Sequence, residues 1–175
     1  MVTLAPSTLD GLLALAARLP CRIIEGADGS IYLERYTLAE LDGGGHLYLH
    51  RFRRGDEDRE LHNHPWHGES RILWGSYREE RLVDARPLIS PAGEATITGR
   101  VIEHVYRPGS TSTLTPETYH RIDLITAEVW TLFVTGPAVQ SWGFWSRTTG
   151  LVTPWRDFIR AKGQTPYEHP RSSER

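Results

Sequence analysis

The stretch "LHNHPWHGESRILWG", residues 61–75, places three histidines and a glutamate just ahead of an apolar run. Alternate side chains of a strand share one face, so His62 and His64 can present two imidazole nitrogens to one point. A short bend with proline and glycine follows, after which Glu69 can return a carboxylate from the neighbouring strand. Such convergence is what a metal ion requires of its ligands, and it predicts a metal site here.

A further ligand has to come from elsewhere in the chain, and His120, at the start of "YHRIDLI", is the best-placed histidine. The predicted ligands are therefore His62, His64, Glu69 and His120. Mixed imidazole and carboxylate ligands suit Fe(II), Mn(II), Ni(II), Cu(II) or Zn(II). His67 leaves three alternatives open: a ligand in place of Glu69, an acid or base beside the metal, or a loop residue. Ligation by the other three histidines, with Glu69 beside the metal, fits the sequence equally.

Strand parity predicts the residues around such a site. If Glu69 faces inward, Arg71, Leu73 and Tyr77 lie on the same side. Arg71 would then bind a substrate carboxylate, support Glu69 or lie at the rim, and Tyr77 would help to orient the substrate. The six tryptophans are interpreted as residues that pack in the core or at an interface, not as a cage around the substrate. This applies especially to Trp66, Trp74, Trp142 and Trp145.

Beyond this stretch, the chain consists of short strand-like segments with turn residues between them, which predicts an all-β sandwich or barrel. The segments include "CRIIE", "IYLERY", "HLYLHRFR", "SRILWGSYREERLV", "EATITG", "VIEHVYRP", "YHRIDLI", "VWTLFVTG" and "SWGFWS". A short amphipathic helix is predicted between Leu9 and Leu19, before Pro20. A second helix or turn is expected at "PWRDFIR", and the polar end "EHPRSSER" is expected to be frayed.

Composition bounds the possible partners. The 175 residues are 39% hydrophobic and carry a formal charge of -2, with acidic and basic residues well mixed. One domain of this charge has no electrostatic field that would attract nucleic acid or an anionic membrane.

The single cysteine, Cys21, excludes an internal disulfide and suits a reducing compartment; we expect it to be buried and inert. No apolar run reaches the length of a membrane span, and Asp10 and Arg18 interrupt the signal-like N-terminal segment, so a soluble, cytoplasmic protein is expected.

The histidine stretch resembles the first motif of the cupin superfamily: a glycine, HxH, three or four residues, a glutamate and a further glycine. The chain offers Gly55, His62, His64, Glu69 and Gly75. The first interval is one residue longer than usual and the last is one shorter. The second cupin motif is more degenerate, since "PETYH" keeps Pro116 and His120 but lacks the glycine, and Leu124 stands where asparagine is usual. The resemblance covers about residues 30 to 147.

The resemblance implies an antiparallel jelly-roll barrel, which we place in residues 21–150. The predicted N-terminal helix then lies in residues 1–20, and residues 151–175 form a C-terminal extension. It implies a metal-dependent enzyme acting on a small organic molecule, foremost a non-haem Fe(II) dioxygenase. Redox-neutral isomerisation or lysis on a metal, and binding of a small ligand without turnover, are the alternatives. Cupins often pair through exposed strands, so a homodimer is also expected.

Overall fold

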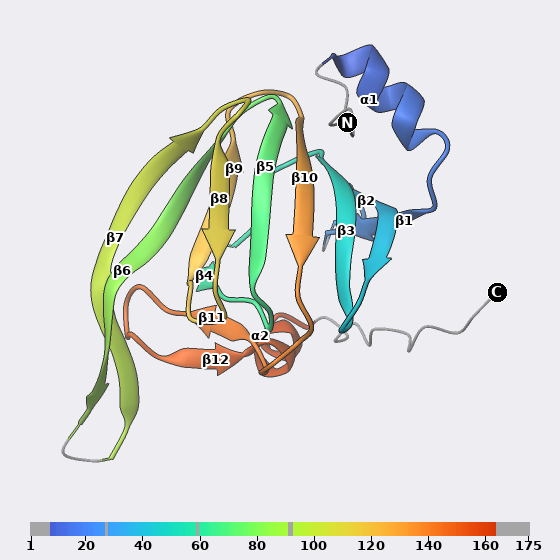
Figure 1. The fold of residues 1–175 in the computed structure, drawn as a ribbon. Coiled ribbons are helices and arrows are strands. Elements are labelled where there is room, and N and C mark those ends of the chain that lie inside the picture. Colours follow the sequence, from blue (N-terminus) through green and yellow to red (C-terminus); the bar gives the residue numbers. More distant parts are fainter. Residues whose placement is uncertain (1–7, 27, 59, 91–92, 164–175) are drawn as a thin grey trace.

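The computed structural model describes residues 8–26, 28–58, 60–90 and 93–163, and it confirms the all-β prediction. Two six-stranded antiparallel sheets face each other and form a nearly closed barrel (Figure 1). The first sheet has the spatial order β1 (Cys21–Glu25), β2 (Ile31–Leu41), β3 (Gly45–Phe52), β10 (Val129–Thr135), β5 (Gly68–Trp74) and β8 (Thr111–Leu114). The second has the order β12 (Val152–Pro154), β11 (Gly143–Trp145), β4 (Leu61–His62), β9 (His120–Leu124), β6 (Tyr77–Ile89) and β7 (Ala95–Tyr106).

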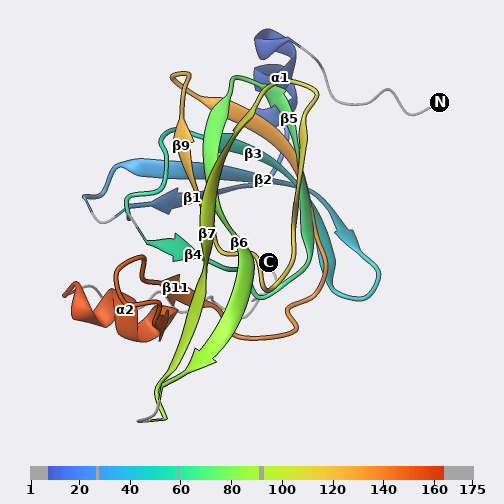
Figure 2. The same cartoon turned by 90° about the vertical axis from the view of Figure 1, so that its left-hand side faces the viewer.

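Helix α1 (Leu9–Ala16) covers the outer face of the first sheet. The Thr8 hydroxyl caps it by accepting a hydrogen bond from the amide of Gly11. Leu12, which is fully buried, packs with Leu49 of β3 and Trp130 of β10. This helix, expected from the leucine spacing, therefore shields one side of the barrel from water (Figure 2).

The two faces of the first sheet follow from strand parity. Leu49 and Trp130 point outward to α1, whereas the neighbouring Phe52 and Ile72 pack inside the barrel against residues of the second sheet. The inner face of β3 also carries His50, which is 3% exposed. The inner face of β3 therefore contributes a polar side chain to the barrel interior.

Strand boundaries differ from the sequence expectation in two places. The segment "SRILWGSYREERLV" is split into β5 and β6 by a turn in which Gly75 adopts a positive φ of 73°. A Cβ there would lie 2.2 Å from the carbonyl oxygen of Glu128, so the turn requires glycine. Conversely, "EATITG" and "VIEHVYRP" belong to one long strand, β7, which pairs with β6 in a hairpin that extends past the barrel (Figure 1).

Helix α2 (Trp155–Ala161) forms at the predicted "PWRDFIR" segment. Phe158 stacks on Phe144 of β11 with ring centroids 3.9 Å apart, and Trp155 stacks on Trp142 at 5.5 Å. These contacts hold the C-terminal extension against the second sheet. The "EHPRSSER" segment lies outside the described residues.

The expectation that Cys21 is buried is wrong, because this residue lies exposed at the start of the edge strand β1. Partial desolvation and the nearby Glu34 carboxylate raise the pKa of its thiol, which favours the protonated form at neutral pH. Within the described residues, neither helix has the length and apolar character needed to cross a membrane.

Candidate metal centre

Three histidines far apart in the sequence come together between the two sheets. His62, His64 and His120 each offer a ring nitrogen, and these nitrogens lie within 4.8 Å of one another. The ring centroids form a nearly equilateral triangle with sides of 5.0, 5.1 and 5.1 Å. The structure thus brings together the three histidines that the sequence analysis selected.

Backbone pairing explains how the sequence assembles this cluster. His62 in β4 lies directly opposite His120 in β9 across an antiparallel ladder. Strand β4 ends at His62, yet the next residue keeps the alternation: Asn63 points away and is 5% exposed. Its side-chain amide donates to the carbonyl of Pro116 at 2.7 Å and accepts from the amide of Gly143 at 2.8 Å. The central residue of "HNH" therefore anchors the segment between its two histidines.

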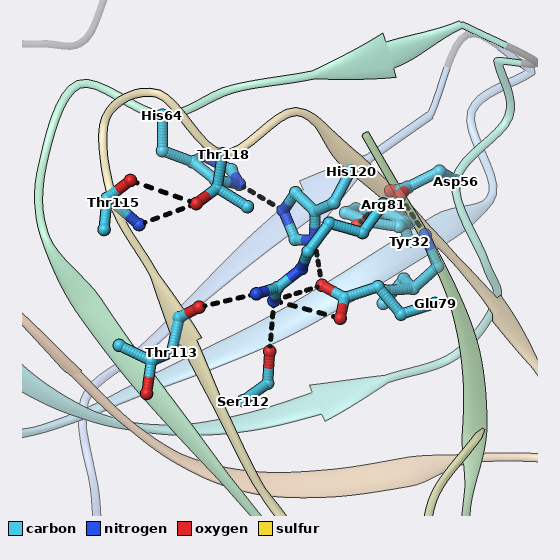
Figure 3. A network of polar contacts seen from close by, with 11 residues as sticks. Tyr32, Asp56, His64, Glu79, Arg81, Ser112, Thr113, Thr115, Thr118 and His120 are labelled. Carbon is cyan, nitrogen blue, oxygen red and sulfur yellow. Dashed lines mark hydrogen bonds and ion pairs between the residues drawn. The ribbon is translucent and has the colours of Figure 1, made fainter. Parts of the chain in front are cut away.

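A hydrogen-bonded turn precedes His120. The amide of Thr118 donates to the carbonyl of Thr115 at 2.9 Å, and the amide of Thr115 donates to the hydroxyl of Thr118 at 3.0 Å. Figure 3 shows the contacts between these two threonines. The turn fixes the direction in which the chain enters β9 and so positions His120.

The nitrogen positions fit a bound transition metal. The Nε2 atoms of His64 and His120 are 3.0 Å apart. Two nitrogens bound at right angles to one ion, each at about 2.1 Å, would be separated by about 3.0 Å. Three imidazoles are moreover the donors that zinc, copper, iron and nickel accept in proteins.

Glu79 of β6, which the sequence analysis did not select, orients one of these histidines. It is 1% exposed, and its Oε1 lies 2.6 Å from Nδ1 of His120 (Figure 3). Arg81 in turn donates to both carboxylate oxygens of Glu79 at 3.0 Å and to the hydroxyl of Ser112 at 3.0 Å. Because a carboxylate accepts at Nδ1, the Nε2 lone pair of His120 is directed to the cluster, as carboxylate partners of metal-binding histidines commonly arrange.

The pKa values of the residues at the site favour protonation states in which a metal ion can bind. Burial, together with the neighbouring His120 and Arg121, lowers the pKa of His62 to about 4. Burial and the other two histidines lower the pKa of His64 well below its ordinary value. Burial alone would raise the pKa of Glu79, but its bonds to His120 and Arg81 outweigh this and lower it. The lowered pKa values keep His62 and His64 neutral and Glu79 ionised at neutral pH, and metal binding needs neutral imidazole ligands.

Two tryptophans form walls around the cluster, although the sequence analysis interpreted them as packing mass. The Trp66 ring stacks on His64 with centroids 4.4 Å apart and planes 9° from parallel. Trp142 lies 6.2 Å from His62 and 6.5 Å from His64. The packing interpretation does hold for Trp145, which is 5% exposed in a core cluster.

Glu69 and His67 lie away from the histidine cluster. Both are exposed, and they line a shallow depression at the end of β5 and β10. The physical reason is the register of β5, in which Ser70 and Ile72 occupy the buried positions. Glu69 therefore takes the outward parity, and the structure supplies Glu79 as the carboxylate near the cluster instead.

The same register separates the residues that were expected to share the inward face. Arg71 is exposed, and Leu73, of the same parity, packs on the outer side near α1. Tyr77 does face inward and is 3% exposed, but it packs in an apolar cluster with Ile72 and Ile122. The turn at residues 75–76 accounts for this change of side between β5 and β6.

Comparison with solved structures finds distant similarity to Fe(II) HppE, to oxalate decarboxylase and to a protein named KdgF. Fe(II) HppE in complex with substrate gives a TM-score of 0.48 at 11% identity, over 69% of this chain and 57% of that chain. KdgF from Halomonas sp. gives 0.45 at 13% identity, over 67% and 87%. Oxalate decarboxylase from Bacillus subtilis gives 0.48 at 17% identity, over 86% and 36%. The chain thus spans little more than half of HppE, and about a third of oxalate decarboxylase.

No protein-family model matches the sequence, and neither does any curated protein. The description of the fold therefore rests on the arrangement of the strands and of the histidines inside the barrel. Two facing antiparallel sheets close into a barrel, and the histidines of the HxH segment meet a histidine of a later strand inside it. The structure therefore confirms the antiparallel double-sheet barrel that the resemblance to cupins implied, with the histidines of that resemblance inside it.

Proposed function

We propose that this protein is a cupin-like, metal-dependent enzyme acting on a small organic molecule, with His62, His64 and His120 as the metal ligands. One observation carries the proposal: three imidazoles, of which His120 is buried and the other two are half-buried, each bring a ring nitrogen within 4.8 Å of the others. Three protein ligands leave coordination positions open for water or substrate, which is typical of catalytic rather than structural metal sites. The hydrogen bond from His120 to Glu79 supports the same assignment.

The finer proposal is a non-haem Fe(II) dioxygenase. Fe(II) suits a nitrogen-rich site with open positions, and Mn, Ni, Cu or Zn are the competing ions. When bound, the metal would supply Lewis acidity and a binding position for a small reactant. The protein's own residues would orient His120 through Glu79 and keep bulk water from His64 through the stacked Trp66.

An oxygen electrode tests this proposal. The protein is purified anaerobically without a metal-binding tag, loaded with Fe(II), and supplied with small organic acids, alcohols and amines in turn. We expect oxygen uptake with at least one class of compound, dependent on Fe(II) and lost in His62→Ala.

Turnover at an unchanged rate without oxygen would contradict the dioxygenase and leave a redox-neutral metal enzyme. Stoichiometric metal with compound binding and no turnover would indicate a binding protein. In a parallel experiment the metal-free protein is offered Fe(II), Mn(II), Ni(II), Cu(II) and Zn(II) separately, and failure to retain any of the five ions would overturn the metal-dependent function itself.

A further inference from the structure

Arg35 of β2 is a guanidinium on the inner side of the first sheet without an acidic partner among the described residues. Its Nε donates to Nε2 of His50, which lies opposite it on β3, at 3.2 Å. Its guanidinium carbon lies 5.0 Å from the centroid of the Tyr48 ring. Neither contact supplies a negative charge, and no ion pair of Arg35 is formed within the described part of the chain.

The outward-facing arginine of the next strand shows the usual arrangement. Arg51 of β3 donates to Glu128 at 2.6 and 2.9 Å and lies 3.5 Å from Glu34. Partly buried cations are normally paired in this way, because removing a charge from water costs free energy that an opposite charge offsets. Arg35 departs from this rule within the same sheet.

A second arginine lies beside Arg35 on the same face of the sheet. Arg22 of β1 lies directly opposite Arg35 in the antiparallel register, and hence on the same face of the sheet. Burial lowers the pKa of Arg35, and the charge of Arg22 lowers it further. On the same inner face, the buried Thr131 hydroxyl has no hydrogen-bond partner, and Thr131 lies opposite His50 in the register.

A continuous row of rings joins this group to the candidate metal centre. The His50 ring lies 4.8 Å from Phe133, Phe133 lies 5.2 Å from Trp66, and Trp66 stacks on His64 at 4.4 Å. The charges of Arg35 and His50 also contribute to the lowered pKa of His64. Arg35 therefore belongs to the same interior as the three histidines, on the wall formed by β2 and β3.

We propose that Arg35, held in place by His50, binds a carboxylate of the small-molecule ligand. The guanidinium can offer its terminal N–H donors to both oxygens of a carboxylate while Nε remains bonded to His50. A carboxylate would supply the negative charge that the described residues do not provide. This inference rests on the proposed function, since it places the rest of the ligand at the histidine centre and assigns the substrate class as small organic acids.

Binding of matched charged and neutral probes tests the inference. Benzoate and butanoate are compared with benzamide and butanamide by isothermal titration calorimetry on the metal-loaded full chain. We expect at least one carboxylate to bind about tenfold or more tightly than its amide, and Arg35→Gln to abolish that difference. Arg35→Lys keeps the charge but loses the paired donors, and is expected to bind with intermediate affinity.

Arg78→Gln is the matched control, because Arg78 is exposed on β6 and its only described ion pair, with Glu103, spans 3.9 Å. Metal content and the thermal midpoint are measured for each variant to show that the fold is retained. Equal carboxylate affinity in Arg35→Gln and the parent would overturn the inference, as would the absence of a carboxylate preference in the parent. If the inference fails in one of these ways but the protein retains its metal, the proposed function stands. If the protein holds no metal but carboxylate binding still requires Arg35, only the metal proposal fails.

Discussion

At the scale of single residues, Glu79 is the side chain whose role differs most from what the sequence suggests. It is almost fully buried, and it is tied to His120 on one side and Arg81 on the other. We predict that Glu79→Gln weakens metal binding about 10-fold to 100-fold, because the neutral amide holds the His120 ring less firmly and makes its nitrogen less basic. Competition with a chelator of known affinity, using Zn(II) or Co(II), measures the change.

Glu69→Gln is the matched control for this prediction, since it removes the same charge from the exposed side of β5. It should leave the metal affinity unchanged. A loss of affinity in Glu69→Gln equal to that in Glu79→Gln would show that the solution structure brings Glu69 to the metal.

The histidines of the site could be predicted from the sequence, whereas the carboxylate could not. His62 and His64 are separated by one residue, and strand parity alone places them together. Glu79 meets His120 only because β6 and β9 are paired, with Arg81 opposite His120. That register depends on contacts between segments about 40 residues apart, which no local pattern encodes. The one local signal for the burial of Glu79 was its position two residues after Tyr77, which places both side chains on the same face of β6. An aromatic residue such as Tyr77 indicates that this face is the buried one.

At the scale of elements, Glu128 connects β3 to the start of β10. Its carboxylate accepts hydrogen bonds from Arg51 and Arg53 and from the indole of Trp130. Burial alone would raise the pKa of Glu128, but these partners outweigh it and lower the pKa. We predict that Glu128→Gln lowers the free energy of unfolding by about 1–2 kcal/mol at neutral pH, measured by urea denaturation.

The pH dependence of this loss follows from the lowered pKa. A carboxyl whose pKa is lower in the folded state stabilises the fold above its ordinary pKa of about 4.3, and this contribution disappears as the pH falls through the folded-state value. The difference between the parent and Glu128→Gln should therefore be constant above about pH 5 and shrink below about pH 4. A difference that grows on acidification would contradict the assignment.

Helix α1 makes a separate contribution as the cover of the first sheet. Leu12 is 0% exposed and packs against Leu49 and Trp130. Leu12→Ala should lower the free energy of unfolding by about 2–4 kcal/mol, because it leaves a cavity under the helix. Leu13→Ala is the control, since Leu13 is 39% exposed and should cost far less. Equal losses in the two variants, measured by urea denaturation, would show that α1 does not pack on the sheet in solution.

The presence of most elements was predictable, but several of their limits were not. Alternating apolar residues predicted the strands, and the leucine spacing predicted α1. The break at Gly75 and the unbroken β7 depend on tertiary context: one on the close approach of Glu128, the other on pairing with β6 along the hairpin. Turn residues inside "EATITGRVIEHVY" therefore did not end the strand, because the partner strand continues beside them.

At the scale of the whole molecule, the barrel separates two kinds of surface. The outside of the first sheet is apolar under α1, where Leu49 and Trp130 pack. The inside combines an apolar cluster around Ile72 with a polar wall that carries Arg35 and His50. The three histidines lie on the same inner side, where strands of the second sheet meet the segment after β4. This arrangement is the basis of the two proposals above, a metal at the histidines and a small organic acid bound at Arg35 in the same interior.

The central claim is that His62, His64 and His120 hold one catalytic metal ion, and elemental analysis tests it most directly. The protein is purified anaerobically without a metal-binding tag, offered Fe(II), desalted and analysed beside His62→Ala, His120→Ala and the outer-face control His67→Ala. We predict about one ion per chain in the parent and in His67→Ala, and less than a tenth of that in the other two variants. A parent that holds no metal, or full metal content in both His62→Ala and His120→Ala, would contradict the account.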